Sequence, residues 1–395
     1  MSDGPRALAP SEWDQLDHVV GTVFRPTMFH NYPQLFNDAN RENLRVVADD
    51  GKLVCHVGMI ERAASLAGCR VDVCCIGGVA TLNEYRGKGY ASAAFQDACD
   101  KAARDGMDVM LISGGRGLYT RVGCRQVGLD WDFTLDEAQA ERLASVRPPG
   151  GGGFRLAQLT RENIAAASAL YAAEHVRFIR RAEDWEMALD CRVVMNTASD
   201  FWGVWLGETL VAYAIVHDPT KARRRPEDAP LTRVVEFAGQ RAAILSSLPE
   251  LRRRYGTERI RIHAQGSDPV LAEVLRASTG AEGAPSGFSG TLRVINFAQL
   301  LERCRPLLAE RIGWTNVRDM SFAADAPAGK DHGGFTIRRE TQEVRVADLG
   351  SAANFLFGAR SRPAEDSDPT GDAALKADLS RALPLPVPWY GISYV

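Results

Sequence analysis

Two glycines between basic side chains are the residues best suited to chemistry, in the stretch Arg86-Gly87-Lys88-Gly89-Tyr90-Ala91. Because glycine has no side chain, a ligand can come close to the backbone N–H groups there. Arg86 and Lys88 add positive charge to these donors. If a helix begins at this point, its first N–H groups lack partners and its dipole favours a negative charge. The stretch therefore predicts a binding turn for an anion such as a diphosphate.

A strand and a helix must hold this turn. The apolar segment 73–82 before it predicts a buried strand. The segment after it has apolar residues at three- and four-residue spacing, which predicts an amphipathic helix that ends at Gly106. Two glycines by themselves are also typical of a plain tight connection between a strand and a helix, so the residues around them decide. The apolar residues of the helix are Ala91, Ala94, Phe95, Ala98 and Ala102.

A second strand and a segment with a tyrosine follow the helix. Residues 107–113 are apolar and predict the strand, and Gly117-Leu118-Tyr119-Thr120-Arg121-Val122-Gly123-Cys124 comes next. A strand, an Arg-x-x-Gly-x-Ala turn, a helix, a strand and a Tyr-x-Arg-x-Gly segment in this order resemble the GNAT superfamily of N-acetyltransferases. In that superfamily the turn is the pyrophosphate loop for coenzyme A. Cys124 stands where the family more usually has an aromatic residue.

The resemblance implies an enzyme that uses acetyl coenzyme A, and it gives each part of the stretch a role. A backbone N–H group at the end of the first strand, in Val79, Ala80 or Thr81, would polarise the thioester carbonyl. Tyr119 matches the general acid that protonates the departing thiolate, with a packing role on a short helix as the alternative. The residues expected to bind the coenzyme are Val79, Ala80, Thr81, Arg86, Gly87, Lys88, Gly89, Tyr90, Ala91 and Ser113.

The chain of 395 residues is too long for one ordinary core, and its length indicates two or three domains. The run Pro148-Pro149-Gly150-Gly151-Gly152-Gly153 interrupts any regular element and predicts a linker. Beyond it the pattern starts again, because residues 207–211 repeat the turn and strand of 51–54. A second domain of the same fold is therefore expected, with 234–239 as its central strand and 241–254 as its helix. Since no Arg-x-x-Gly-x-Ala follows that strand, this domain is not expected to bind a coenzyme in the same way.

From residue 289 onward, short strands and helices follow one another, at 291–296, 297–308, 335–339, 343–346, 351–357 and 375–383. Two GNAT-like units followed by an α+β unit similar to the sterol carrier protein fold form the layout of the enhanced intracellular survival (Eis) family of acetyltransferases. The fold class that this resemblance implies is α+β, with tandem GNAT mixed sheets, flanking helices and a C-terminal sterol-carrier-protein-like domain. The expected bounds are 1–147 for the catalytic domain, 148–153 for the linker, 154–288 for the second domain and 289–395 for the third.

The C-terminus is the base that the resemblance to the Eis family implies. There the carboxylate of the last residue, here Val395, is directed into the active site, where it would deprotonate the acceptor ammonium. Three prolines stiffen the apolar tail from Leu383, although packing of the tail explains them equally well. Chains of that family end in aromatic residues, whereas this one ends in valine. His56, Glu61 and Glu84 are the other candidates for the base. The resemblance also implies assembly as a hexamer.

The acceptor that the resemblance implies is a primary amine on a small cationic molecule, such as an aminoglycoside, or on a lysine side chain. Aromatic and apolar residues cluster after the first helix, where they either line an acceptor pocket or pack locally. Acidic side chains that an ammonium would favour are scattered along the chain. The aromatic and apolar residues are Phe24, Met28, Phe29, Tyr32, Leu35 and Phe36, and the acidic candidates are Asp14, Asp38, Glu42 and Glu236.

Charge and composition exclude several other classes. A net charge of -3 gives no basic footprint for nucleic acid, and the arginine runs at 223–225 and 252–254 are typical of solvated faces. The start of the chain lacks the order of a signal peptide, and no apolar run approaches the ~20 residues that cross a bilayer. The eight cysteines have no disulfide spacing and the seven histidines no ligand spacing. We therefore expect a cytoplasmic protein with no membrane partner and no metal.

A second functional class fits the same residues. The chain can be interpreted as a non-catalytic protein that binds acyl-CoA or lipid and keeps only a vestigial transferase site. The intact Arg-x-x-Gly-x-Ala turn and Tyr119 favour the enzyme, because an abandoned site has no reason to keep both.

Overall fold

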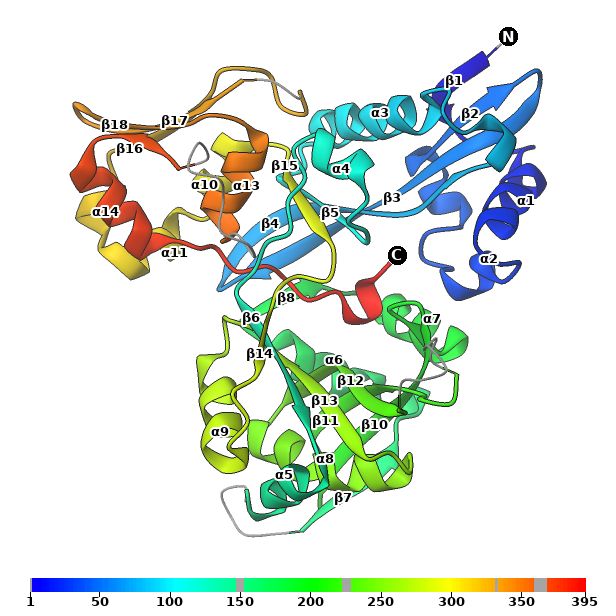
Figure 1. Ribbon diagram of the computed structural model, residues 1–395, viewed down its shortest axis with the longest axis vertical. Coiled ribbons are helices and arrows are strands. Elements are labelled where there is room, and N and C mark those ends of the chain that lie inside the picture. The colour runs from blue at the N-terminus through cyan, green and yellow to red at the C-terminus, as the bar shows by residue number, and fades with distance from the viewer. Residues whose placement is uncertain (1, 147–152, 222–228, 331–332, 359–367) are drawn as a thin grey trace. The chain divides into compact units, whose positions relative to one another are not determined.

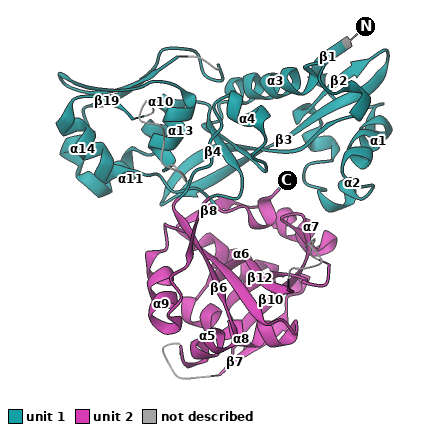
Figure 2. Cartoon of the chain, viewed as in Figure 1, with its two compact units in different colours: residues 1–128, 288–388, 395 teal, residues 129–287, 389–394 magenta. Residues whose placement is uncertain are grey.

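The computed structural model describes residues 2–146, 153–221, 229–330, 333–358 and 368–395. The chain forms two compact units, which Figure 2 shows in different colours. Both units combine mixed β-sheets with flanking helices (Figure 1), which confirms the α+β fold class that the sequence predicted. Unit 1 comprises residues 1–128, 288–388 and 395, and unit 2 comprises residues 129–287 and 389–394.

The first sheet, in unit 1, has the strand order β1-β2-β3-β4-β5-β15. Neighbouring strands are antiparallel except β4 and β5, which are parallel and joined by helix α3 (Tyr90–Arg104). A parallel pair needs such a crossover because its second strand starts at the same edge as the first. The strands are β1 (Ser2–Ala7), β2 (Leu44–Asp49), β3 (Lys52–Leu66), β4 (Cys69–Thr81), β5 (Val109–Ile112) and β15 (Thr291–Val294).

Helix α3 packs one apolar face on this sheet, in a cluster with residues of β3, β4 and β5. Its buried alanines are small, so the helix can approach the strands closely. Of the face that the sequence predicted, Ala94, Phe95, Ala98 and Ala102 are buried and Ala91 is partly buried. Three shorter helices complete this part of unit 1, namely α1 (Trp13–Val23), α2 (Met28–Asn31) and α4 (Gly117–Arg121).

The C-terminal part of unit 1 adds a small antiparallel sheet with helices beside it. The sheet has the order β16-β17-β18-β19. Its strands are β16 (Met320–Ala324), β17 (Phe335–Arg339), β18 (Gln342–Val346) and β19 (Thr370–Gly371). The helices are α10 (Phe297–Arg303), α11 (Arg305–Ile312), α12 (Trp314–Val317), α13 (Leu349–Phe357) and α14 (Ala373–Ala382).

The single helix expected at 297–308 is in fact two, α10 and α11, which meet at Cys304. Pro306 lies in the first turn of α11. Proline has no backbone N–H and its ring excludes the preceding turn, so it is accepted at the start of a helix but not in its interior. The apolar spacing predicted the helical segment but not the break.

Unit 2 contains a second sheet with the order β14-β6-β13-β12-β11-β10-β7, and β9 (Val193–Val194) pairs with β10. As in the first sheet, one adjacent pair, β12 and β13, is parallel, and helix α8 (Arg241–Arg254) joins it. The repeated pattern in the sequence thus corresponds to a repeated arrangement of strands. The strands are β6 (Asp130–Leu135), β7 (Phe154–Gln158), β10 (Thr197–Leu206), β11 (Thr209–His217), β12 (Leu231–Gly239), β13 (Arg259–Ala264) and β14 (Ala284–Ser286). Unit 2 also has strand β8 (Val176–Ile179) and helices α5 (Glu137–Arg142), α6 (Ile164–Ala172), α7 (Ala182–Cys191) and α9 (Pro269–Thr279).

Each sheet includes a strand from outside the range of residues that was expected to form it. β6 precedes residue 147 yet pairs with β13 and β14, whereas β15 follows residue 288 and pairs with β5. β6 therefore lies in the second sheet, although its residues fall within the bounds expected for the first domain. Its alternating pattern predicts a strand but not the sheet that it joins. The division at 1–147, 154–288 and 289–395 stays a prediction, and residues 148–152 of the predicted linker lie outside the described residues.

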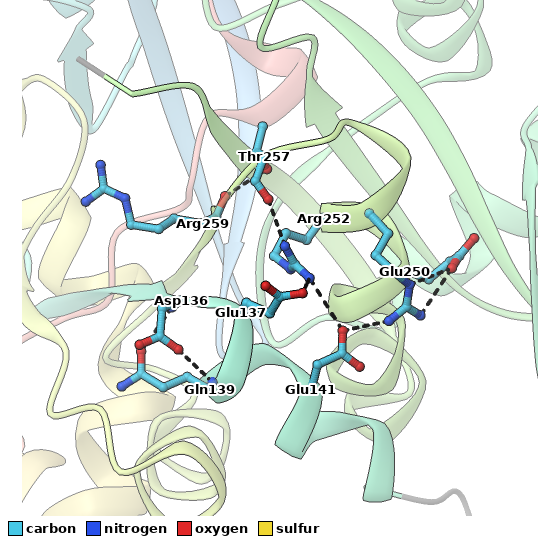
Figure 3. Close-up of polar contacts among 9 residues, drawn as sticks. Asp136, Glu137, Gln139, Glu141, Glu250, Arg252, Thr257 and Arg259 are labelled. Atoms are coloured by element: carbon cyan, nitrogen blue, oxygen red, sulfur yellow. Dashed lines mark hydrogen bonds and ion pairs between the residues drawn. The ribbon is translucent and has the colours of Figure 1, made fainter. Parts of the chain in front are cut away.

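Arg252, near the end of α8, is buried, although its arginine run was expected on a solvated face. Its guanidinium donates to the carbonyl oxygen of Thr257 at 2.9 Å and to a carboxylate oxygen of Glu137 at 2.6 Å (Figure 3). These partners compensate the charge that burial would otherwise leave exposed to a low dielectric. The neighbouring Arg253 is exposed and pairs with Glu141. The other run, 223–225, lies outside the described residues.

All eight cysteines are free thiols, and seven of them are buried. Cys74 and Cys75 lie side by side on β4 and are fully covered, so they act as small apolar residues. In the described parts of the chain, no helix is both long and apolar enough to span a bilayer. No three His, Cys, Asp or Glu side chains of the described ranges gather into a metal site.

Candidate active site

The parallel ladder between β4 and β5 ends before β4 does. It pairs Val73–Ile76 with Val109–Ile112, whereas β4 continues to Thr81. Ala80 and Thr81 still pair with β3. The opposite edge of this last part of β4, which includes Val79, therefore lies past the end of the ladder with β5. The three residues predicted to polarise a carbonyl are all in this part of the strand.

The glycine turn leads directly into helix α3. A short 3-10 turn, Asn83–Tyr85, follows β4, and α3 begins at Tyr90 with Gly89 at its N-cap position. Gly87 and Gly89 have φ angles of +81° and +84°, a region that residues with a side chain rarely adopt. A Cβ atom built on either glycine would meet no described atom within 4 Å. The turn is thus open, and it fits the pyrophosphate that the resemblance implies.

The side chains of this turn have one unexpected neighbour, Asp49 at the end of β2. The Tyr90 hydroxyl donates to its carboxylate at 3.0 Å, and the Lys88 ammonium lies 3.9 Å from it. The exposed Arg86 donates from Nε to the carbonyl oxygen of Thr81 at 3.3 Å. Asp49 therefore orients two of the predicted site residues. In the sequence Asp49 is part of an Asp-Asp-Gly turn, which does not indicate such a role.

Tyr119 lies on α4, which follows β5, and its side chain is buried. Its ring centre is 5.4 Å from that of Phe95 on α3. Gly114 also approaches the ring, since a Cβ built there would lie 3.2 Å from Cε2 of Tyr119. Ser113, directly after β5, donates from its N–H and from its hydroxyl to the carbonyl oxygen of Ile76 on β4, each at 3.3 Å. The tyrosine is thus held against the helix that begins at the glycine turn.

The C-terminal carboxyl group contacts β4. Val395 is only 3% exposed. A Cβ atom built on Gly77 would overlap the carboxyl carbon of Val395 and would lie 3.1 Å from its Cβ. Gly77 directly follows Ile76, where the ladder with β5 ends. The resemblance predicted a carboxylate at the site, but it did not predict Gly77 as the residue that leaves room for it.

His56, a candidate base, is fully buried on β3 beside Gly78. Its Nδ1 atom lies 2.8 Å from the carbonyl oxygen of Gly78, which can only accept, so Nδ1 carries the proton. Burial lowers the pKa of His56 to about 4, although this hydrogen bond raises it, and the ring is neutral at neutral pH. Its Nε2 atom is buried and has no hydrogen-bond partner within the described ranges. The ring therefore presents a free lone pair beside the end of β4.

The aromatic residues after α1 reach the same part of β4. Phe29 and Phe36 are stacked with ring centres 4.6 Å apart, and the Phe36 ring is 5.8 Å from that of His56. A Cβ built on Gly78 would lie 3.3 Å from Cζ of Phe36. Phe36 therefore packs on the strand that carries the candidate site.

The acidic residues considered for the acceptor are spread over the molecule. Asp14 and Glu84 line one open cavity of about 420 Å³ in unit 1. Asp38 accepts a hydrogen bond from the Trp13 indole at 3.0 Å, and Glu42 pairs with the adjacent arginine. Asp14 thus borders a cavity, whereas Asp38 and Glu42 contact neighbouring side chains.

Two further acidic candidates have partners of their own. Glu61 lies 3.6 Å from Lys101 in the last turn of α3, at the opposite end of that helix from the glycine turn. Glu236 on β12 forms a buried ion pair with Arg180, in which each carboxylate oxygen is 2.7 Å from a guanidinium nitrogen. Both carboxylates are therefore already engaged within the fold.

Residues 5–127 match the family model for the acetyltransferase (GNAT) domain. This range contains β4, the glycine turn, α3 and Tyr119. The resemblance to the GNAT superfamily is thereby confirmed for the first part of the chain. The sequence matches none of the curated proteins.

Three solved structures share the fold over most of their length. A GCN5-related N-acetyltransferase from Anabaena variabilis ATCC 29413 is 13% identical, with a TM-score of 0.65 over 98% of this chain and 99% of that chain. A GCN5-related N-acetyltransferase from Kribbella flavida is 14% identical, with a TM-score of 0.63 over 100% and 98%. Eis1 from Mycobacterium abscessus is 15% identical, with a TM-score of 0.55 over 77% and 76%. Together with the family model, these likenesses in fold support an N-acetyltransferase.

Proposed function

We propose that this protein transfers an acetyl group from acetyl coenzyme A to a primary amine on a small cationic molecule, such as an aminoglycoside, or on a lysine side chain. One observation carries the proposal. Unit 1 contains the open glycine turn, the part of β4 beyond its ladder with β5, the buried Tyr119 and the carboxyl group of Val395, which contacts Gly77 of β4. The acetyltransferase (GNAT) match over residues 5–127 supports the same reaction class.

Residues 86–91 would hold the pyrophosphate. With Gly87 and Gly89 at positive φ, the backbone N–H groups of the turn and of the first turn of α3 can converge on one anion, which the helix dipole also favours. The exposed Arg86 can add a charged hydrogen bond to a phosphate oxygen. Acetyl coenzyme A supplies the reactive thioester when bound. The contribution of these residues is to hold that group in position, which reduces the entropic cost of the reaction.

A backbone N–H of Val79, Ala80 or Thr81 would stabilise the negative charge that develops on the thioester oxygen. These groups are held in place because β4 still pairs with β3, through Ala80 with His56 and Thr81 with Cys55. A fixed donor of this kind contributes about 3 kcal/mol to transition-state stabilisation.

Tyr119 would return a proton to the departing sulfur. A phenol has a reference pKa of about 10, so it still carries its proton at neutral pH and can donate that proton to a thiolate. The packing of its ring on Phe95 supports this role, because the hydroxyl of a fixed ring has a defined direction.

The carboxylate of Val395 would take the proton from the acceptor ammonium. Its contact with Gly77 supports this role, since Gly77 and the proposed oxyanion donors belong to one strand. His56 is the alternative base, because its neutral ring has a buried Nε2 lone pair and lies beside Gly78. Variants at Gly77 and at the chain end separate the two bases.

Isothermal titration of acetyl coenzyme A into the full-length protein tests the proposal. We expect one-to-one binding that is lost in Arg86→Ala/Gly89→Trp. The matched control is Arg259→Ala/Gly256→Trp, because Arg259 is exposed and a Cβ on Gly256, at φ +60°, meets no described atom within 4 Å. No binding by the wild type would rule out the enzyme. Binding without acetylation of any amine in a panel would support a non-catalytic protein that binds acyl-CoA.

We also propose that the chain has the Eis layout, with a sterol-carrier-protein-like C-terminal domain, and that it works in the cytoplasm as a hexamer. The β16-β17-β18-β19 sheet with its neighbouring helices supports the third domain. Sedimentation equilibrium tests the assembly, and a monomer at micromolar concentration would exclude the hexamer.

A further inference from the structure

We propose that the edge of β12 past the end of its ladder with β13 is a socket that binds the chain's own segment Trp389–Ser393. In unit 1 the corresponding place is the end of β4, past its ladder with β5, where the thioester is proposed to bind. Arg180 and Glu236 are then positioning residues, since they hold the segment that carries the terminal carboxylate. The inference builds on the function proposed above, in which Val395 acts as the base. Its binding part, the socket, is independent of that function.

The start of α8 leaves no room for a pyrophosphate turn. In the first sheet, β4 ends at Thr81 and α3 begins only at Tyr90, whereas β12 ends at Gly239 and α8 already begins at Arg241. A carboxylate of the chain itself occupies this point. Glu174 accepts from the N–H of Gly239 at 3.0 Å and from the Arg241 guanidinium at 2.6 and 2.9 Å. An incoming phosphate would meet this negative charge, so the second sheet does not bind a coenzyme in the manner of the first.

Trp389 occupies the edge of β12 just past the end of its ladder with β13. That ladder ends at Val234 and Ile262. The indole N–H of Trp389 donates to the carbonyl oxygen of the next residue, Val235, at 2.6 Å. Trp389 also lines, with Val235, a cavity of about 220 Å³. The tail thus contacts the part of the strand that corresponds to the end of β4.

The same indole stacks on His263, which directly follows Ile262 on β13. The ring centres are 3.8 Å apart. The two nitrogens of His263 lie 3.0 Å from a carboxylate oxygen of Asp132 and 3.1 Å from one of Asp130. Both contacts are hydrogen bonds when both nitrogens carry protons. Burial lowers the pKa of His263, but its hydrogen bonds to Asp130 and Asp132 raise the pKa above its ordinary value. In the protonated state the ring makes a cation–π contact with the indole.

Arg180 and Glu236 bind the rest of the segment. Glu236 Oε2 accepts from the backbone N–H of Ile392 at 2.9 Å, while Arg180 donates to the Ser393 hydroxyl at 3.0 Å and to the carbonyl oxygen of Tyr390 at 3.3 Å. Both charged side chains are almost fully buried. Apart from the Tyr213 hydroxyl, which donates to Glu236 Oε1 at 2.7 Å, the remaining hydrogen bonds of this buried ion pair go to the segment. The pair is therefore costly to leave without it. The tail therefore supplies hydrogen-bond partners that the buried ion pair needs.

Gly391 fits the socket only because it lacks a side chain. A Cβ built on it would overlap Oε2 of Glu236 and would lie 3.1 Å from its Cγ. Val395 follows Ser393 by two residues, which span at most about 7 Å. Fixing Ser393 therefore restricts the carboxylate of Val395 to a small volume, as a general base requires.

The test is Gly391→Ala in the full-length protein, with Gly256→Ala as the matched control. Gly391 and Gly256 have similar φ angles, +50° and +60°, so both variants strain the backbone alike, but only the first creates an overlap. The first measurement is trimming by a carboxypeptidase under native conditions, followed by intact-mass spectrometry. We expect Gly391→Ala to lose Val395 at least ten times faster than the wild type, and Gly256→Ala to match the wild type.

Activity then separates the socket from the proposed function. With the socket and the base both correct, Gly391→Ala lowers kcat at least tenfold and leaves the Kd of acetyl coenzyme A unchanged. Faster trimming with unchanged kcat would support the socket and remove Val395 as the base. Trimming at the wild-type rate would overturn the socket, whatever the activity.

A second variant covers the case in which Gly391→Ala does not fold. Trp389→Phe keeps a ring on His263 but loses the N–H that bonds Val235, so we expect trimming between that of the wild type and that of a released tail. Trimming of Trp389→Phe at the wild-type rate, with Ser393→Ala also unchanged, would overturn the proposal.

Discussion

Gly77 on β4 is in direct contact with the carboxyl group of Val395, the last residue of the chain. A Cβ atom on Gly77 would overlap the carboxyl carbon and would lie 2.5 Å from a carboxyl oxygen. Space alone excludes a side chain here, because the φ angle of Gly77 is outside the left-handed region. A residue near the middle of the central strand is therefore constrained by the chain end.

Replacing Gly77 by alanine should push the carboxylate away from β4. We expect kcat to fall at least tenfold, while the Kd for acetyl coenzyme A, measured by isothermal titration, stays within a factor of two because the glycine turn is untouched. Gly153→Ala is the control, since a Cβ there meets no described atom within 4 Å. Full activity of Gly77→Ala would show that the carboxylate is not needed at this place.

Adding one glycine after Val395 should also lower turnover. The extra residue moves the charge by about 3.5 Å and must fit where Val395 is only 3% exposed. Steady-state kinetics should show a loss of 10²-fold or more in kcat, within the range of general base catalysis. One glycine added before Met1 is the control. An extended chain with wild-type turnover would leave His56 as the base.

Tyr119→Phe should lower kcat by roughly 10²- to 10⁴-fold, because the proton for the leaving thiolate is lost while the ring still packs on Phe95. The Kd for acetyl coenzyme A and the melting temperature should change little. Tyr255→Phe is the matched control, since it also removes one hydroxyl that bonds an aspartate, here Asp200 in unit 2. Equal turnover of the two variants would reduce Tyr119 to a packing residue.

The stability of the protein should fall in mild acid because of His56. Burial lowers the pKa of His56 from 6.5 to about 4 in the folded state. Below pH 6.5 the unfolded chain therefore binds a proton at His56 that the folded chain does not bind. The loss accumulates down to about pH 4 and amounts to roughly 3 kcal/mol. Urea unfolding between pH 7 and 4 should show this slope, and His56→Gln should flatten it. An equal slope in the variant would assign the acid sensitivity to other groups.

The glycine turn was predictable because the chemistry of phosphate binding is local in sequence. Two glycines, a basic side chain and the start of a helix fall within residues 86–91, between a strand and a helix with clear periodicity. The same holds for the apolar face of α3 and for the two strands, β4 and β5, before and after it. Each of these depends on neighbours within one supersecondary unit.

The remaining parts of the site depend on contacts between distant residues. Nothing around Gly77 indicates that it meets Val395, and Glu236 looked like any acidic residue until its partner Arg180 was seen. Arg252 likewise needs Glu137, a residue of another helix, to be buried. Such pairs leave no periodic signal, so only the folded structure reveals them.

The first sheet includes the late strand β15, and the second sheet includes β6, which precedes the glycine-rich linker. This arrangement has a consequence for protein synthesis. On the ribosome, β5 (Val109–Ile112) emerges long before its partner β15. One edge of this apolar strand therefore stays unpaired until all of residues 129–287 have been made. A nascent chain stopped at the glycine-rich linker would carry that exposed edge together with β6, which has no sheet to join. Neither sheet can therefore be completed during translation before the other is nearly finished, and a gene cut at the linker would yield two aggregating fragments instead of two domains.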